Sequence, residues 1–280
     1  MKHLPALATA ASALIALTLT GCGLAKSDAD VGQKNGDITT LTIGTSVTPH
    51  GDIWRFIDEN LAKDVGLDIE VKEFNDYSLP NRALNDGELD ANYFQHVPYL
   101  KSEIKGQGYK LHHFMPGVHV EPFALYSKKN KDIAELPDGA KIGINNDPAN
   151  QGRALKLLAD NGLISLGDAD PITATIHDVA ENPKNLEFIE AEAASLARTL
   201  DDTDASVING NNALGAGLSS KKDGILVESP KDNPYANVLV VREGTQDDPA
   251  IKKLNELAHS QEVKDFITKT WPKGEVIPAQ

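Results

Sequence analysis

The sequence predicts an α/β fold of two lobes with a ligand cleft between them. Residues 40–71 hold two alternating apolar runs on either side of a segment with helical spacing, which is the pattern of a βαβ unit. A polar break at residues 127–131 is followed by a second cycle of strand, loop and helix that begins at residue 140. Each cycle would form one lobe, and clefts between domains are preferred sites for small molecules.

The first cycle begins with a strand at residues 40–45, where apolar and polar residues alternate. Thr48 and Pro49 then form a typical helix start, a capping residue followed by proline at the first helical position. Gly66 can end this helix. Residues 67–71 alternate again, so we expect a second, parallel strand reached by a right-handed crossover. The apolar face of the helix is formed by Ile53, Trp54, Ile57 and Leu61.

Two clusters of aromatic and amide residues, at residues 75–81 and 91–96, bracket a short helical segment at residues 82–90. Neither cluster has the spacing of a core element, and each follows an apolar run. We therefore expect each cluster to lie where a strand ends, at the edge where open α/β sheets bind ligands. Aromatic residues make up only 5% of the chain, so a functional reason is expected for the clustering of Tyr77, Tyr93 and Phe94.

The rest of the chain continues the α/β pattern to its end. Further strands are expected at residues 109–120, 123–126, 140–144, 186–189, 205–208 and 237–241. Further helices are expected at residues 97–105, 151–158, 193–200, 249–257 and 261–268.

The composition excludes some classes of partner. The chain has 280 residues, of which 27 are Lys or Arg and 41 are Asp or Glu, giving a formal net charge of −14. A nucleic-acid partner needs a basic face that displaces counterions, so we expect none. Electrostatic docking on anionic lipid is disfavoured for the same reason. The chain has no glycine-rich run with a lysine, so we expect no P-loop. We also expect no cofactor.

The N-terminus resembles a bacterial lipoprotein signal peptide that ends in a lipobox. A weakly basic start precedes an apolar run, shorter than a membrane-spanning helix, which leads into Leu19-Thr20-Gly21-Cys22. We predict a signal peptide at residues 1–21, lipidation of Cys22, and a flexible tether at residues 22–37. The protein would then be lipid-anchored on the extracytoplasmic face of the cell membrane. The alternative is an ordinary secretory signal with a chance cysteine.

Arg153 suggests an anion site. If its helix starts at Asn150, Arg153 lies in the first turn, where the helix dipole disfavours a cation by about 0.3–1 kcal/mol. A bound anion shared with the free helix amides would resolve the conflict. A carboxylate fits, because arginine holds it with two parallel hydrogen bonds. The alternative is an exposed arginine that points into water.

Two asparagines occupy positions that suit ligand contacts. Asn209 follows an apolar strand directly, so it should lie at the carboxyl end of that strand and face the cleft. Asn237 follows a turn and leads into another strand. An amide can accept from an ammonium group and donate to a carboxylate. Both asparagines can also be explained by turn formation alone.

A metal site and an enzyme are less well supported. His112 and His113 are adjacent, so in a strand they point to opposite faces and cannot easily share a metal. A metal receptor that uses these two with His119 and Glu121 remains an alternative. The sequence has no nucleophile elbow, no zinc-type spacing of His or Cys, and no outstanding carboxylate pair. We therefore expect no enzyme and no metal.

An ordered series of motifs resembles the NlpA lipoprotein family, in particular its methionine-binding proteins that serve ABC transporters. The matches run from the lipobox to beyond residue 241, which makes the series more specific than any single motif. They include Phe74-Asn75-Asp76-Tyr77, Leu79-Pro80-Asn81, Asp90-Ala91-Asn92, Phe94-Gln95-His96, Asn146-Asp147-Pro148, Gly152-Arg153, Glu181-Asn182-Pro183-Lys184-Asn185-Leu186, Val207-Ile208-Asn209 and Lys222-Asp223-Gly224-Ile225.

The resemblance implies a two-lobed periplasmic-binding-protein fold of type II with two hinge strands. The chain would cross between the lobes near residues 123–126 and 238–241. Lobe 1 would then comprise residues 38–124 and 241–280, and lobe 2 residues 125–240. The implied function is the capture of L-methionine, or a close analogue, for the permease and ATPase of an ABC importer.

The resemblance also carries over six ligand contacts. Lobe 1 would line the side-chain pocket and hold the amino group through Tyr77, Phe94 and His96. Lobe 2 would bind the backbone end of the amino acid through Arg153, Asn209 and Asn237. Residues 117–122, Asn211 and Asn212 depart from the family pattern. If they reach the pocket, the ligand could instead be another amino acid or a short peptide. Two further alternatives, independent of these departures, are a metal ion as ligand and a surface interaction lipoprotein.

Overall fold

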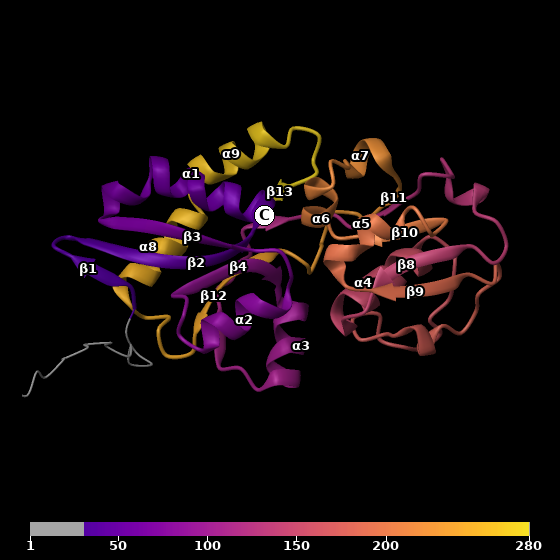
Figure 1. The fold of residues 1–280 in the computed structure, drawn as a ribbon, viewed down its shortest axis with the longest axis horizontal. Helices are drawn as coiled ribbons and strands as arrows, with labels where there is room; N and C mark the ends of the chain where they lie inside the picture. The colour runs from indigo at the N-terminus through magenta and orange to yellow at the C-terminus, as the bar shows by residue number, and fades with distance from the viewer. Residues whose placement is uncertain (1–30, 280) are drawn as a thin grey trace, which may run out of the picture.

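The computed structural model describes residues 31–279, which fold into two α/β lobes, each built on its own sheet (Figure 1). Within these residues the first sheet has eight strands in the order β1-β2-β4-β12-β6-β13, with β3 beside β2 and β5 beside β12. Its strands are β1 (Gln33–Asn35), β2 (Ile38–Ser46), β3 (Leu67–Phe74), β4 (Ala91–His96), β5 (Leu111–His113), β6 (His119–Val120), β12 (Asn237–Arg242) and β13 (Ile277–Pro278).

The second sheet has the order β11-β7-β10-β8-β9. Its strands are β7 (Ala124–Tyr126), β8 (Lys141–Asn145), β9 (Glu187–Ala191), β10 (Ala205–Ile208) and β11 (Gly224–Val227). The α-helices of the described chain are α1 (Asp52–Asn60), α2 (Ser78–Asn85), α3 (Val97–Gln107), α4 (Pro148–Asp160), α5 (Leu196–Thr199), α6 (Gly210–Gly215), α7 (Ser220–Asp223), α8 (Pro249–Ala258) and α9 (Gln261–Thr270). None of these helices is both long and apolar enough to cross a membrane.

The predicted βαβ unit is present, since β2 and β3 run parallel with α1 between them. Gly66 ends the helical turn before β3 with φ of 75°, a conformation that glycine adopts readily. The helix start differs from the prediction. Thr48 has extended backbone angles, and the α-helix proper begins at Asp52, whose carboxylate accepts a hydrogen bond from the Thr48 hydroxyl at 2.7 Å.

The second aromatic and amide cluster was wrongly expected at the end of a strand. Residues 91–96 are strand β4 itself, completely buried between β2 and β12. The amides are tolerated in the core because they bond to one another. Asn92 donates to Asn81 Oδ1 at 2.9 Å, and Asn81 donates to Gln95 Oε1 at 2.8 Å. The preceding helix also begins earlier than expected, at Ser78.

Strand pairing places both crossings between the lobes closer to the N-terminus than predicted. Ala124 already pairs in the second sheet, whereas β6 belongs to the first, so the first crossing lies at residues 121–123. All of β12 pairs in the first sheet, so the second crossing precedes Asn237 and not residue 241. Residues 33–35 of the expected tether form β1 and pair with β2. The predicted signal peptide and the rest of the tether up to residue 30 lie outside the described residues.

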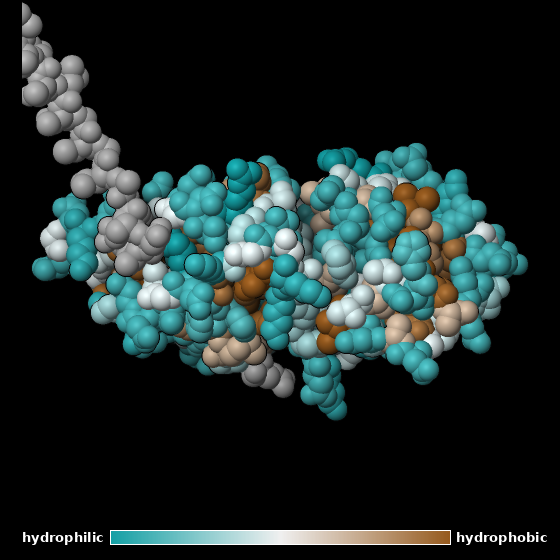
Figure 2. Space-filling model, turned by 90° about the horizontal axis from the view of Figure 1, so that it is seen from below, coloured by the Kyte–Doolittle hydropathy of each residue, from teal (hydrophilic) through white to brown (hydrophobic). Residues whose placement is uncertain are grey.

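Each lobe has its own hydrophobic core. In lobe 1, α1 packs through Trp54 and Ile57 into a cluster that also contains Leu254 of α8 and Ile267 of α9, so both ends of the described chain share this lobe (Figure 1). Lobe 2 is built around β8, β10 and α4, with Leu155 among its fully buried residues. The face in Figure 2 is mostly hydrophilic, with hydrophobic side chains in separate patches, as the charge composition suggests.

Candidate functional site

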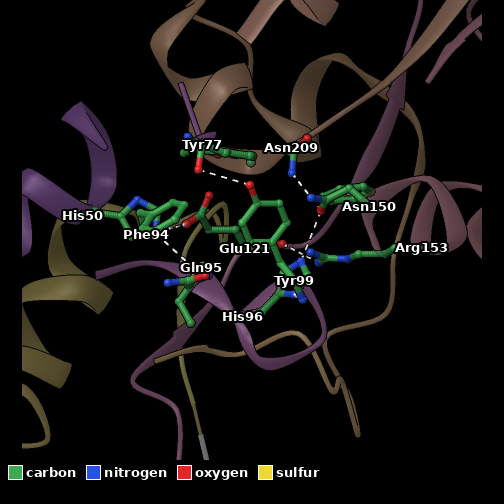
Figure 3. Close-up of a pocket in the computed structure, with 14 residues that line it drawn as sticks. His50, Tyr77, Phe94, Gln95, His96, Tyr99, Glu121, Asn150, Arg153 and Asn209 are labelled. Atoms are coloured by element: carbon green, nitrogen blue, oxygen red, sulfur yellow. Dashed lines mark hydrogen bonds and ion pairs between the residues drawn. The ribbon is translucent and has the colours of Figure 1, made fainter. Parts of the chain in front are cut away.

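A cavity between the lobes is lined by all six predicted ligand residues. Figure 3 labels Tyr77, Phe94, His96, Arg153 and Asn209 among them. The empty space along the cavity is about 330 Å³, part of which is open to solvent. Its walls come from both lobes, with α4 and the start of α6 on the side of lobe 2, and from the crossing at residues 121–123. The lining residues are His50, Tyr77, Phe94, Gln95, His96, Tyr99, Glu121, Phe123, Asn150, Arg153, Asn209, Gly210, Asn211 and Asn237. The six predicted contacts leave out eight of these, among them Glu121, which the sequence suggested only as an alternative metal ligand.

One end of the cavity is aromatic. The ring centroids of Tyr77 and Phe94 lie 5.8 Å apart, and Tyr99 lies 5.8 Å from Tyr77 and 6.0 Å from Phe94. The Tyr99 hydroxyl donates to the main-chain oxygen of Tyr77 at 3.1 Å, which fixes the two rings relative to each other. Three aromatic rings form a wall suited to an apolar, polarisable side chain.

His96 lies at the N-terminus of α3 and is neutral. Burial, followed by the nearby Arg153 charge, lowers the pKa of His96 to about 3. Its Nδ1 accepts from the main-chain nitrogen of Tyr99 at 3.2 Å, so the proton is on Nε2, which donates to Asn150 Oδ1 at 3.2 Å. No ring nitrogen is then free to accept from an ammonium group. The hydrogen bonds therefore favour a positioning role for His96 over its predicted role as holder of the amino group.

Arg153 is placed differently from the prediction. Helix α4 begins at Pro148 and is capped by Asp147, so Arg153 lies in the second turn and the argument from the helix dipole was wrong. The guanidinium donates through Nε to Glu228 Oε1 at 2.9 Å and through Nη2 to Glu228 Oε2 at 2.5 Å. Nη2 also donates to the main-chain oxygen of Glu121 at 2.9 Å.

Two aromatic rings complete the setting of Arg153. The guanidinium carbon lies 3.9 Å from the ring centroid of Phe123 and 4.3 Å from that of Tyr235. The side chain is only 4% exposed, so it does not point into water. Burial alone would raise the pKa of the Glu228 carboxyl, but the charge and hydrogen bonds of Arg153 bring that pKa below its usual value. Arg153 is therefore a fixed, buried cation whose position is set before any ligand arrives.

The two predicted asparagines are held by polar side chains of the chain itself. Asn209 follows β10 as expected, and it donates to Asn150 Oδ1 at 3.1 Å while accepting from Asn145 Nδ2 at 2.8 Å. Asn237 is the first residue of β12, and its Oδ1 lies 3.3 Å from Nε2 of His50. Both amides face the cavity from fixed positions.

Glu121 is a buried carboxylate on the cavity wall, 5% exposed. Its Oε1 lies 2.8 Å from Nε2 of His119 and 3.2 Å from Nε2 of His50. Burial raises the pKa of Glu121 and lowers the pKa of His50 to about 4 and that of His119 to about 3. A Cβ atom at Gly210 would lie 2.6 Å from the Glu121 Cβ, so only glycine permits this close approach.

The four residues that the sequence suggested as an alternative metal site do not lie together. His119 and Glu121 are together, but His112 and His113 lie on β5, opposite Val241 and Val240. Among the described residues, the group of His, Cys, Asp or Glu whose donor atoms could share a metal is His50, His119 and Glu121. His50 could have been suspected, because it follows the end of β2 as the aromatic residues follow β3.

Hydrogen bonds also join the lobes across the cavity. The Tyr77 hydroxyl donates to Asn211 Oδ1 at 2.5 Å and accepts from Asn212 Nδ2 at 3.2 Å. The bond between His96 and Asn150 is a second link. The two asparagines that depart from the family pattern therefore reach the site, Asn211 as a wall residue and Asn212 through Tyr77.

Comparisons with known proteins agree with this architecture. Residues 41–280 match the NlpA lipoprotein family. The chain is 43% identical over 264 residues to the methionine-binding lipoprotein MetQ of Bacillus subtilis, covering 93% of each chain. It is 42% identical over 271 residues to the D-methionine-binding lipoprotein MetQ of Escherichia coli, covering 95% of this chain and 96% of the relative.

Solved structures show the same fold. A nutrient binding protein from Burkholderia cenocepacia, bound to methionine, superposes with a TM-score of 0.82 at 44% identity, covering 86% of this chain and 100% of that one. A crystal structure of the methionine-binding protein MetQ gives a TM-score of 0.81 at 41% identity, with 86% and 98% covered. The predicted two-lobed periplasmic-binding-protein fold is thus confirmed, and the chain belongs to the NlpA lipoprotein family.

Proposed function

We propose that this protein captures L-methionine, or a close analogue, and delivers it to the permease and ATPase of an ABC importer. The observation that carries the proposal is one interlobe cavity lined both by aromatic rings and by the buried ionisable side chains of Arg153 and Glu121. Relatives named as methionine-binding lipoproteins support it, and so does the fold shared with a protein bound to methionine. A binding role without catalysis is consistent with those names.

The zwitterionic end of an amino acid needs a cation and an anion close together. The main-chain oxygen of Glu121 accepts from Nη2 of Arg153, so these two residues meet at the cavity wall. The bonds to Glu228 and Glu121 use Nε and Nη2, which leaves Nη1 to donate to a ligand carboxylate. Glu121 would accept from the ammonium group, in place of His96. Asn209 and Asn237 would complete the polar contacts.

The side chain of the ligand would extend toward Tyr77, Phe94 and Tyr99. A thioether beside aromatic rings contributes about 0.3–1.5 kcal/mol, which favours methionine over an alkyl side chain of similar length. Asn211 at the same wall can accept an analogue with an added polar group. Ligand that bridges the lobes would stabilise the closed arrangement by a hinge motion about the two crossings.

The ligand assignment can be tested on protein purified without refolding. Mass spectrometry of the released ligand should find methionine. After ligand removal, L-methionine should raise the melting temperature more than leucine does, because a ligand at 100 times its Kd stabilises the folded state by about 2.7 kcal/mol. D-methionine, methionine sulfoxide and methionyl dipeptides would define the analogue range. An unchanged melting temperature with methionine and all these analogues at millimolar concentration would refute the assignment.

The lipid anchor is a separate part of the proposal, since Cys22 lies outside the described residues. In cells, Cys22→Ala should move the protein from the membrane fraction to the soluble extracytoplasmic fraction, because the thiol that takes the lipid is gone. Ser27→Ala, five residues further along the predicted tether, is the matched control and should remain with the membrane. Unchanged fractionation of Cys22→Ala would show that this cysteine does not anchor the protein.

A further inference from the structure

His50, His119 and Glu121 form a compact group of metal-type ligands that the proposed amino-acid site does not fully use. Their donor atoms all lie within 4.8 Å of one another. In a tetrahedral zinc site with bonds of about 2.0–2.1 Å, neighbouring ligand atoms are about 3.3 Å apart. Here Glu121 Oε1 lies 3.2 Å from His50 Nε2 and 2.8 Å from His119 Nε2, so both spacings are within about 0.5 Å of that geometry.

The three side chains are buried. His50 is 1% exposed, His119 0% and Glu121 5%. They come from two separate segments, the turn after β2 and the end of β6 where the chain leaves lobe 1. His50 and Glu121 line the interlobe cavity, so an ion can reach them from that side.

A second residue supports one of the histidines from behind. The Tyr93 hydroxyl contacts Nδ1 of His119. A hydroxyl can accept as well as donate, so Tyr93 can hold the Nδ1–H tautomer that directs Nε2 toward an ion.

We propose that His50, His119 and Glu121 bind a divalent transition metal of the Zn²⁺ class. Two imidazoles and one carboxylate are a ligand set that zinc accepts. The site does not depend on methionine being the ligand of this protein. It differs from the set suggested by the sequence, because His112 and His113 are replaced by His50. The competing explanation is that the two histidines only hold Glu121 in place by hydrogen bonds.

The test is Zn²⁺ titration of the full-length protein, stripped of metal and carrying no histidine tag, by calorimetry, with Co²⁺ absorption as a spectroscopic readout. We expect one ion per chain and a Co²⁺ spectrum of low coordination number. His50→Gln, His119→Gln and Glu121→Gln should each weaken binding at least tenfold. Tyr93→Phe should weaken it by about 10–100-fold, because a second-shell partner of a ligand is lost.

His113→Gln and His112→Gln are the matched controls, since both residues lie on β5 outside the group, and they should bind Zn²⁺ as the unmodified protein does. Melting curves followed by circular dichroism show whether each variant is folded, so a loss of binding can be told from a loss of folding. If His119→Gln does not fold, the test relies on His50→Gln. Absence of stoichiometric binding would overturn the proposal. So would unchanged affinity in folded His50→Gln and Glu121→Gln, or a loss confined to the β5 variants.

Discussion

Replacing Arg153 with alanine is expected to weaken methionine binding by at least 100-fold and to lower the free energy of unfolding by about 3–5 kcal/mol. Both effects have one cause. The change removes the proposed partner of the ligand carboxylate, and it leaves Glu228 as a buried charge with no cation beside it. Calorimetry with methionine and urea unfolding of the ligand-free protein measure the two effects independently.

A double variant separates the two roles of Arg153. Arg153→Ala with Glu228→Gln removes the unpaired charge, so most of the lost stability should return while binding stays weak. If the single variant binds methionine within tenfold of the unmodified protein, the ligand carboxylate does not contact Arg153. If the double variant is no more stable than the single one, the loss of stability in Arg153→Ala arises from lost packing against Phe123 and Tyr235.

Glu121→Gln is expected to weaken methionine binding by about 2–5 kcal/mol, because the ammonium group would lose its only proposed anionic partner in a buried site. The substitution keeps the shape of the side chain, and the amide oxygen can still accept from His119. The melting temperature of the ligand-free protein should therefore change little. The binding loss is measured by calorimetry.

An analogue of methionine without the α-amino group provides the control. This carboxylic acid should bind weakly to the unmodified protein and no more weakly to Glu121→Gln, since it has no ammonium group for Glu121 to hold. Equal affinity of both proteins for methionine itself would place the ammonium group elsewhere in the cavity. Equal losses for methionine and the analogue would indicate a general distortion of the site.

The sequence predicted correctly those strands and helices whose burial shows in the spacing of their own apolar residues. The alternation in β2 and β3 and the helical spacing of Ile53, Trp54 and Ile57 reflect burial on one face, which periodicity reports directly. Strand β4 escaped detection because its amides are satisfied by Asn81, a residue on another element. A buried polar residue whose partner is distant in sequence has the same local pattern as an exposed one.

For the candidate site, too, the sequence predicted some features and not others. Resemblance to the family brought six residues together, and all six line one cavity. The sequence could not show that Arg153 is paired with Glu228, 75 positions away, or that Glu121 lies beside His50. Ion pairing across long separations depends on how the two sheets meet, and no short-range spacing encodes it. The roles of Arg153, Glu121 and His96 therefore had to be reconsidered from the geometry.

The hydrogen bonds of Tyr77 with Asn211 and Asn212 have a consequence for timing in the proposed function. They join the two lobes without passing through any ligand, and each such bond contributes about 0.5–1.5 kcal/mol net. In that function, a bound amino acid would leave only after these bonds break, so they would lengthen its residence time without contacting it. They would also oppose reopening after the ligand has gone. Part of the work of unloading would then fall to the proposed transporter, which would have to separate Tyr77 from its two asparagines before the next cycle.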